Sequence, residues 1–288
     1  MDATTLGLDS MSAVASGLNR GALAALDVGL AQADGFGLDR TAVCPFDVDP
    51  SAVVTGRDVG VTRSIRGSLP SWIVPLADAV TLLGDLAVVV GGLVLTILLD
   101  LRRGRRTSRD RLVSDRTAFV VGVVLGGLAV TLILKTIAGA PRPPAELQAV
   151  ERGGHGFPSG HTLAATFLWG ALAIWGRWGT RQRRLLIASV AVGLVAVSRL
   201  VLGVHYLPDV VASITVGVAF LVTAGVLFDE NPRRALGVAA VLGVVALLVT
   251  GATTDGLLAF LGCVGGAVGW LLAGRTVPWS LPTGRSAE

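Results

Sequence analysis

The sequence predicts an all-α integral membrane protein, a helical bundle of about seven transmembrane spans. The chain has 288 residues, of which 52% are hydrophobic and only 15% are charged, and its mean hydropathy is +0.70. Soluble domains are about 45–50% apolar and carry about 25% charged residues. Here the charged residues gather between long apolar runs, a pattern that indicates membrane spans and excludes one large soluble core.

The apolar runs have the length that a transmembrane helix needs. About 20 mostly apolar residues cross the hydrocarbon layer of roughly 30 Å, with a lower limit near 17. Residues 72–80 resemble an interfacial lead-in to the first span, and Asp85 lies unusually inside that span. The expected spans are residues 82–99, 117–136, 162–178, 185–202, 208–228, 235–250 and 256–273.

The arginines predict which side of the membrane each loop faces. Arginine-rich segments follow the first, third, fifth and seventh spans, so they share one side if the helices alternate. The positive-inside rule makes that side cytoplasmic. Arg57, Arg63 and Arg66 lie on the other side, but the loop after the first span alone carries seven arginines. This distribution fits a cell-membrane protein and argues against a nucleic-acid partner, which the net charge of +4 could otherwise suggest.

The spans predict four segments along the chain. Residues 1–66 contain no run long enough to span, and a small ordered cap, a surface-lying helix and a flexible tail all stay open. Residues 67–228 form the expected membrane core, and residues 229–273 add two C-terminal spans. Residues 274–288 are the expected cytoplasmic tail. The sequence leaves the oligomeric state open.

Three polar clusters lie in or beside the loops expected outside the cytoplasm. From His161 to Arg199 is 38 positions, enough for one helix inward, a short basic turn and one helix back. The clusters can therefore converge on one membrane face if the second to fifth spans form a four-helix core. They consist of Lys135 with Arg142, of Ser159, Gly160 and His161, and of Arg199, His205 and Asp209.

The cations of these clusters predict an anion site. A charge at the bilayer centre costs at least about 2.5–3.5 kcal/mol, so Lys135, Arg142 and Arg199 are tolerable near helix ends and suggest a shared anion. Arginine matches phosphate oxygens bidentately, whereas lysine offers a point charge. Ser159 is a suitable N-cap for the third span, whose first free N–H groups and positive dipole end could bind phosphate.

The histidines supply the groups that phosphoryl transfer needs. Asp209 follows His205 by four positions, so its carboxylate can hold one imidazole N–H and make the opposite nitrogen more nucleophilic. His161 can then protonate the departing alkoxide as a general acid. The three cations can supply the electrostatic stabilisation that Mg²⁺ gives elsewhere, so the chemistry requires no metal.

In order and spacing these clusters resemble the signature of the type-2 phosphatidic acid phosphatase superfamily. Its membrane members include lipid phosphate phosphatases and undecaprenyl-pyrophosphate phosphatases, and its soluble relatives include bacterial acid phosphatases and vanadium haloperoxidases. The resemblance is close over residues 135–209. Outside them the chain departs from the common pattern, because only one expected span precedes the matched four and two follow them.

The resemblance implies a role for each matching residue. His205 would be the nucleophile, Asp209 its partner and His161 the general acid. No metal or other cofactor is implied, and the implied partner is a lipid phosphate substrate in the bilayer. The implied phosphate-binding residues are Lys135, Arg142, Ser159, Gly160 through its backbone N–H, and Arg199.

The sequence therefore predicts hydrolysis of a lipid phosphate monoester or diphosphate at the extracytoplasmic face, through a phosphohistidine on His205. Two alternatives stay open. One is a phosphotransferase on the same scaffold, which passes the phosphoryl group to an alcohol. The other is a catalytically inactive lipid-binding or transport protein. The sequence does not distinguish phosphatidic acid, phosphatidylglycerol phosphate and polyprenyl diphosphate as substrates.

Overall fold

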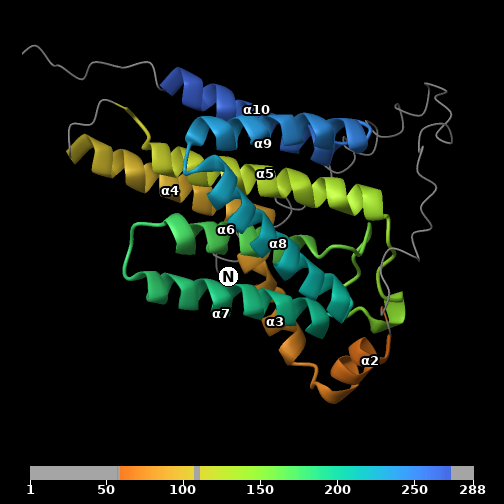
Figure 1. Cartoon of the computed structure of the whole chain (residues 1–288). Coiled ribbons are helices and arrows are strands. Elements are labelled where there is room, and N and C mark those ends of the chain that lie inside the picture. The colour runs from red at the N-terminus through yellow and green to blue at the C-terminus, as the bar shows by residue number, and fades with distance from the viewer. Residues whose placement is uncertain (1–56, 58, 107–110, 274–288) are drawn as a thin grey trace, which may run out of the picture. The chain divides into compact units, whose positions relative to one another are not determined.

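The computed structural model describes residues 57, 59–106 and 111–273. The expectations for residues 1–56 and for the tail at 274–288 lie outside these residues. The regular structure of the described part is helical, as Figure 1 shows. Its elements are α2 (Val59–Ser68), α3 (Ile73–Thr81), η2 (Leu82–Gly84), α4 (Leu86–Arg106), α5 (Asp115–Ala138), η3 (Ala145–Leu147), α6 (Gly160–Trp175), α7 (Arg181–Val201), α8 (Leu207–Phe228), α9 (Pro232–Val249) and α10 (Thr254–Ala273).

Five of the described helices are long and apolar enough to cross a membrane: α5, α7, α8, α9 and α10. The bent pair formed by α3 with η2 and by α4 adds a sixth if it is one span. α6 has 16 residues and ends at Trp175, because Gly176 takes an extended conformation. At 1.5 Å per residue it is about 24 Å long, short of the hydrocarbon thickness. The chain is thus a multi-pass helical membrane protein, and the count of seven spans stays a prediction.

The helical structure that leads into α4 begins earlier than the sequence predicts and is broken. α3 occupies most of residues 72–80, where we expected an interfacial lead-in, and the axis bends by 44° before α4. Asp85 lies at the break in an extended conformation, and its Oδ1 accepts a hydrogen bond from the Ala87 N–H at 2.8 Å. This carboxylate therefore caps the first turn of α4, which explains its place within an apolar run.

The largest buried apolar cluster joins α5 to α6. Phe119 and Val123 of α5 and Phe167 and Leu168 of α6 are almost completely buried in it. α6 also packs against α7 and α8, and it lies between α5 and α7 in Figure 1. The first residues of α6 are therefore surrounded by the helix ends that carry the predicted site residues.

α9 and α10 pack against α5 through glycines. A Cβ added at Gly122 would lie 2.9 Å from the Leu236 nitrogen, so the backbones of α5 and α9 approach closely there. Gly266 of α10 likewise faces Leu125, at 2.9 Å from an added Cβ. Gly122 with Gly126 and Gly262 with Gly266 have the small-xxx-small spacing that is typical of such close helix packing.

Candidate functional site

His205 lies in the short loop between α7 and α8 and is 1% exposed. Its Nδ1 is 2.7 Å from the carbonyl oxygen of Gly156, and its Nε2 is 3.3 Å from a terminal nitrogen of Arg142. A carbonyl oxygen can only accept, so Nδ1 carries the proton and Nε2 keeps its lone pair. Burial lowers the pKa of His205 to about 4, although the Asp209 carboxylate opposes the shift. The ring is therefore neutral near pH 7, the form in which Nε2 is a nucleophile.

Asp209 is close to His205 but is not the hydrogen-bond acceptor that the four-residue spacing predicts. Its Oδ2 is 3.6 Å from His205 Nδ1, beyond hydrogen-bond distance, because the Gly156 carbonyl occupies that direction. The same Oδ2 accepts the Tyr206 N–H at 3.0 Å at the start of α8. Asp209 thus fixes the backbone beside His205 and adds negative charge next to the ring.

Arg57 completes the surroundings of Asp209. Its Nε and one terminal nitrogen donate to the two carboxylate oxygens at 3.0 and 3.2 Å, and that terminal nitrogen also donates to the Pro141 carbonyl at 2.6 Å. The guanidinium stacks on the Tyr206 ring, 4.7 Å from its centroid. Such a bidentate pair is a strong interaction when it is buried. The expected N-terminal segment therefore reaches the site through Arg57.

Arg142 and Arg199 approach the site from two directions. Arg142 donates to the carbonyls of Gly153 and Val204 as well as facing His205 Nε2. Arg199 is 1% exposed, and its terminal nitrogen donates to the Thr81 hydroxyl at 2.9 Å. Its buried Nε has no partner within the described part of the chain. A buried charged donor without an acceptor is costly, so it is a candidate contact for an anion.

Lys135, in the last turn of α5, lies against the start of α6. A Cβ added at Gly160 would be 3.3 Å from Lys135 Nζ, so the missing side chain makes room for the ammonium group. Lys135 also lies within electrostatic range of Arg142 and Arg199. The three predicted cations therefore converge, and an anion between them would relieve their repulsion.

Ser159 occupies the N-cap position of α6, as predicted, but its hydroxyl caps no backbone N–H. It accepts a hydrogen bond from the Thr162 hydroxyl at 3.0 Å, while the Ser159 N–H donates to the Ser213 hydroxyl at 2.8 Å. Ser213 in turn donates to the Asp209 carbonyl at 2.6 Å. These bonds tie the start of α6 to the first turns of α8, the helix that carries Asp209.

His161, the second residue of α6, faces the bend of the first span. Its Nε2 is 3.7 Å from Asp85 Oδ2, and the His161 side chain is 26% exposed. It also lies within electrostatic range of Arg199 and His205. The structure therefore brings together both histidines, the three cations, Ser159, Gly160 and Asp209.

Sequence reasoning missed three contributors to this arrangement: Arg57, Thr81 and Gly156. Asp85 gave a signal, because a carboxylate within an apolar run is a functional candidate. Arg57 gave none, since 152 positions separate it from Asp209 and its loop showed only scattered charge. No group of three or more His, Cys, Asp or Glu residues that could hold a metal ion occurs among the described residues.

The part of the chain that carries these residues is similar to a known family. A family model described as PAP2 superfamily matches residues 116–233, which contain all the site residues predicted from the sequence. This part of the chain belongs to the PAP2 superfamily. Residues of its PAP2 region thus provide both histidines, whereas Arg57 and Asp85 lie before it.

The solved structures include one similar to this PAP2 protein. It is the crystal structure of a transmembrane PAP2-type phosphatidylglycerolphosphate phosphatase from Bacillus subtilis, with 21% sequence identity and a TM-score of 0.52. The match covers 63% of this chain and 90% of that chain. At this identity the likeness concerns the fold. A search of curated proteins gave no match.

Proposed function

We propose that this PAP2 protein hydrolyses a lipid phosphate monoester or diphosphate, without a metal ion, through a phosphohistidine on His205. The setting of His205 carries the proposal: a neutral imidazole whose Nε2 faces a cluster of cations. Within that cluster the buried Nε of Arg199 has no acceptor among the described residues. A phosphate placed there would bind this donor and meet the nucleophilic nitrogen.

The proposed reaction has two steps. His205 Nε2 attacks phosphorus, the bond from phosphorus to the lipid oxygen breaks, and His161 gives a proton to that oxygen. Water then attacks the phosphohistidine, His161 takes a proton from the water, and the bond between nitrogen and phosphorus breaks to release phosphate. Lys135, Arg142 and Arg199 stabilise the charge of the transferred group, and the Gly156 carbonyl holds His205 Nδ1–H throughout.

The test is phosphate release from phosphatidic acid and from a polyprenyl diphosphate in detergent micelles containing EDTA. We expect the wild-type protein to be active and His205→Ala to be inactive. His155→Ala is the matched control, because His155 is an exposed loop histidine. Equal rates for wild type and His205→Ala, or loss of wild-type activity in EDTA, would refute the proposal. Transfer of labelled phosphate to an added alcohol instead of water would favour the phosphotransferase.

The proposed location of the site is the extracytoplasmic face, with α6 as a short seventh span. The arginine distribution supports this orientation. An impermeant maleimide applied to intact cells tests it in a Cys44→Ser background, in which the remaining Cys263 is buried. Glu146→Cys, in the exposed loop beside the site, should react, whereas Arg181→Cys, at the start of α7, should react only after lysis. The reverse pattern would place the site in the cytoplasm.

We also propose that residues 67–228 form the phosphatase core, built on α5, α6, α7 and α8, and that residues 229–273 are an addition to it. The packing of α9 and α10 against α5 supports this division, because the predicted site residues lie on other elements or on the last turn of α5. One role of residues 1–66 is then to supply Arg57, which pairs with Asp209 beside the proposed nucleophile.

A further inference from the structure

A second pocket opens at the end of the helices opposite to the catalytic cluster. The cluster lies at the end of α5 and the start of α6, whereas this pocket lies at the start of α5 and the end of α6, with α4 as its other wall. Its volume is about 570 Å³, within the roughly 300–1,000 Å³ of ligand sites. It shares no lining residue with the site above, so a ligand bound here would be separate from the proposed substrate phosphate.

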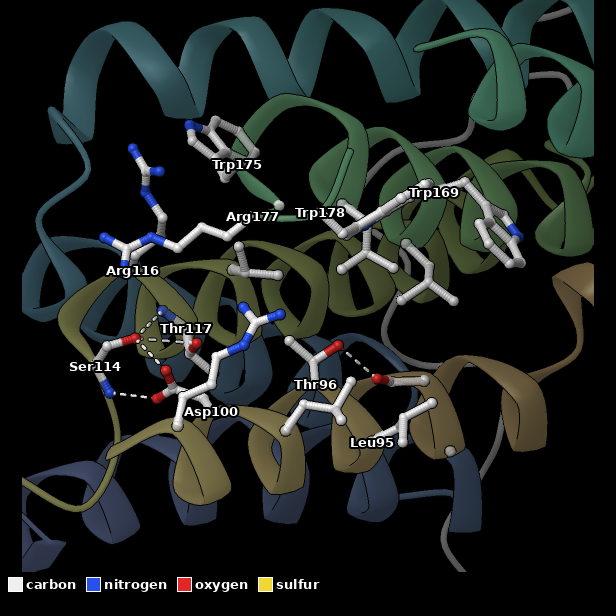
Figure 2. Close-up of a pocket in the computed structure, with 18 of the residues that line it drawn as sticks. Leu95, Thr96, Asp100, Ser114, Arg116, Thr117, Trp169, Trp175, Arg177 and Trp178 are labelled. Carbon is white, nitrogen blue, oxygen red and sulfur yellow. Dashed lines mark hydrogen bonds between the residues drawn. The ribbon is translucent and has the colours of Figure 1, made fainter. Parts of the chain in front are cut away.

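The walls of the pocket are apolar. α4 contributes Val88, Leu95 and Leu99, which are all exposed at its open side, and α6 contributes Leu168 and Leu172. Figure 2 shows the tryptophans of the α6 side facing Leu95 and Thr96 of α4 across the space. Gly91 and Gly92 remove side chains from the α4 wall, and an added Cβ at Gly91 would meet nothing within 4 Å. An extended hydrocarbon chain fits such a wall.

The mouth of the pocket is basic. Arg103, Arg116 and Arg177 line it, and the acidic lining residue is Asp100. Asp100 is engaged elsewhere, because its two oxygens accept the Ser114 N–H at 2.6 Å and the Ser114 hydroxyl at 3.0 Å. Arg116 forms an ion pair with Glu230, 3.0 Å away, and Arg177 adds a further positive charge at the mouth.

Two tryptophans lie near the basic mouth of the pocket. Trp175 packs edge-to-face on Phe119 with ring centroids 4.9 Å apart, and Trp178, just beyond α6, is 37% exposed. Tryptophan is enriched where hydrocarbon meets head groups, and arginine near the inner surface attracts anionic lipid. The pocket thus combines an apolar groove at membrane depth with indole rings and cations at its head-group end.

We propose that this pocket binds an anionic phospholipid from the surrounding leaflet, with one acyl chain between α4 and α6 and its phosphate beside Arg177. The leaflet is the cytoplasmic one if the orientation proposed above holds. The lipid is a bound component distinct from the substrate, so the inference does not depend on phosphatase activity. It would bridge α4 and α6. Nearer the catalytic cluster, the Trp169 Nε1–H of α6 donates to the Leu83 carbonyl of η2 at 3.1 Å.

The experiment measures lipid binding by native mass spectrometry of the detergent-purified full chain, titrated with dioleoyl phosphatidylglycerol or dioleoyl phosphatidylcholine. Gly91→Leu should weaken phosphatidylglycerol binding at least about tenfold, because its side chain fills the open groove. Gly237→Leu is the matched control, on the exposed face of α9 with nothing within 4 Å of an added Cβ. Both changes replace a helical glycine, so a helix-propensity effect would appear in both.

Charge is tested in the same titration. Arg177→Gln should weaken phosphatidylglycerol binding about fivefold, the effect of one cation near a membrane surface, and should leave phosphatidylcholine binding unchanged. Arg233→Gln, an exposed arginine at the start of α9, is the control. His205→Ala should bind as the wild type does, which separates this result from failure of the proposed reaction.

Three outcomes of these titrations would overturn the inference. They are equal affinity for the two lipids, unchanged binding in Gly91→Leu, and equal losses in the pocket and control variants. A dimer that disappears with Gly91→Leu would also overturn it, because a second copy of the chain would then occupy the groove. Quenching of tryptophan fluorescence by brominated phosphatidylglycerol, lost in Gly91→Leu, would support the assigned position, since Trp169, Trp175 and Trp178 line the pocket.

Discussion

Arg57→Ala removes the cation that holds the fully buried carboxylate of Asp209. The guanidinium contacts both carboxylate oxygens, at 3.0 and 3.2 Å, and its side chain is 11% exposed. Removing one partner of a buried ion pair costs about 3–5 kcal/mol, because the other charge stays buried. The Tyr206 N–H still donates to Asp209, so we expect the free energy of unfolding to fall by about 3 kcal/mol, at the lower end of that range.

The assay is unfolding in mixed micelles of dodecyl maltoside and dodecyl sulfate, followed by tryptophan fluorescence. Arg57→Lys should recover part of the loss, since it keeps the charge without the bidentate fork. Arg63→Ala, at an exposed position on α2, is the control and should stay near the wild type. In phosphatase assays Arg57→Ala should lower kcat with little change in KM, because Arg57 contacts Asp209 and not the phosphate position. An unfolding free energy within about 0.5 kcal/mol of wild type, together with unchanged kcat, would refute this reasoning.

Three further predictions concern the site itself. Arg199→Gln removes a buried charged donor, whose hydrogen bond to a bound anion is worth about 1.5–3 kcal/mol. The inhibition constant of vanadate, a phosphate mimic, should therefore rise about 10–100-fold in phosphatase assays. An unchanged constant would exclude Arg199 as a ligand. Burial lowers the pKa of His205 to about 4, and the neutral ring is the nucleophile. We therefore expect kcat/KM to fall as the pH drops through about 4, and an inflection near pH 6.5 would contradict this. Gly84→Ala places a Cβ against the His161 carbonyl, so kcat should fall relative to Gly67→Ala, where the added Cβ meets open space; equal rates would show that α6 adjusts freely.

Much of the site could be predicted because its residues lie at helix ends in a fixed order. Lys135 at the end of α5, His161 at the start of α6 and Arg199 near the end of α7 follow from alternating helices of span length. Antiparallel neighbours necessarily bring these ends to one face. What each side chain bonds there could not be predicted, because the choice between Gly156 and Asp209 for His205 depends on differences of about 1 Å in a folded loop.

The span count and the first span show the limit of the apolar pattern. Hydropathy locates runs that prefer the bilayer, but it does not locate breaks inside them. The bend at Asp85 is set by that carboxylate capping α4, and the early end of α6 is set by the backbone of Gly176. Both are conformations of single residues, and a window of about 20 residues averages over them.

By itself the sequence determined the membrane class and the order of the helices, and it predicted a set of phosphate-binding and catalytic residues, because these follow from apolar run length and from local spacing. Only the tertiary structure decided that Arg57 pairs with Asp209 across 152 positions, that Asp85 faces His161, and that a basic-mouthed groove separates α4 from α6. The physical reason is that local signals act within a few helical turns. Contacts between distant segments are set by how packed helices fit together.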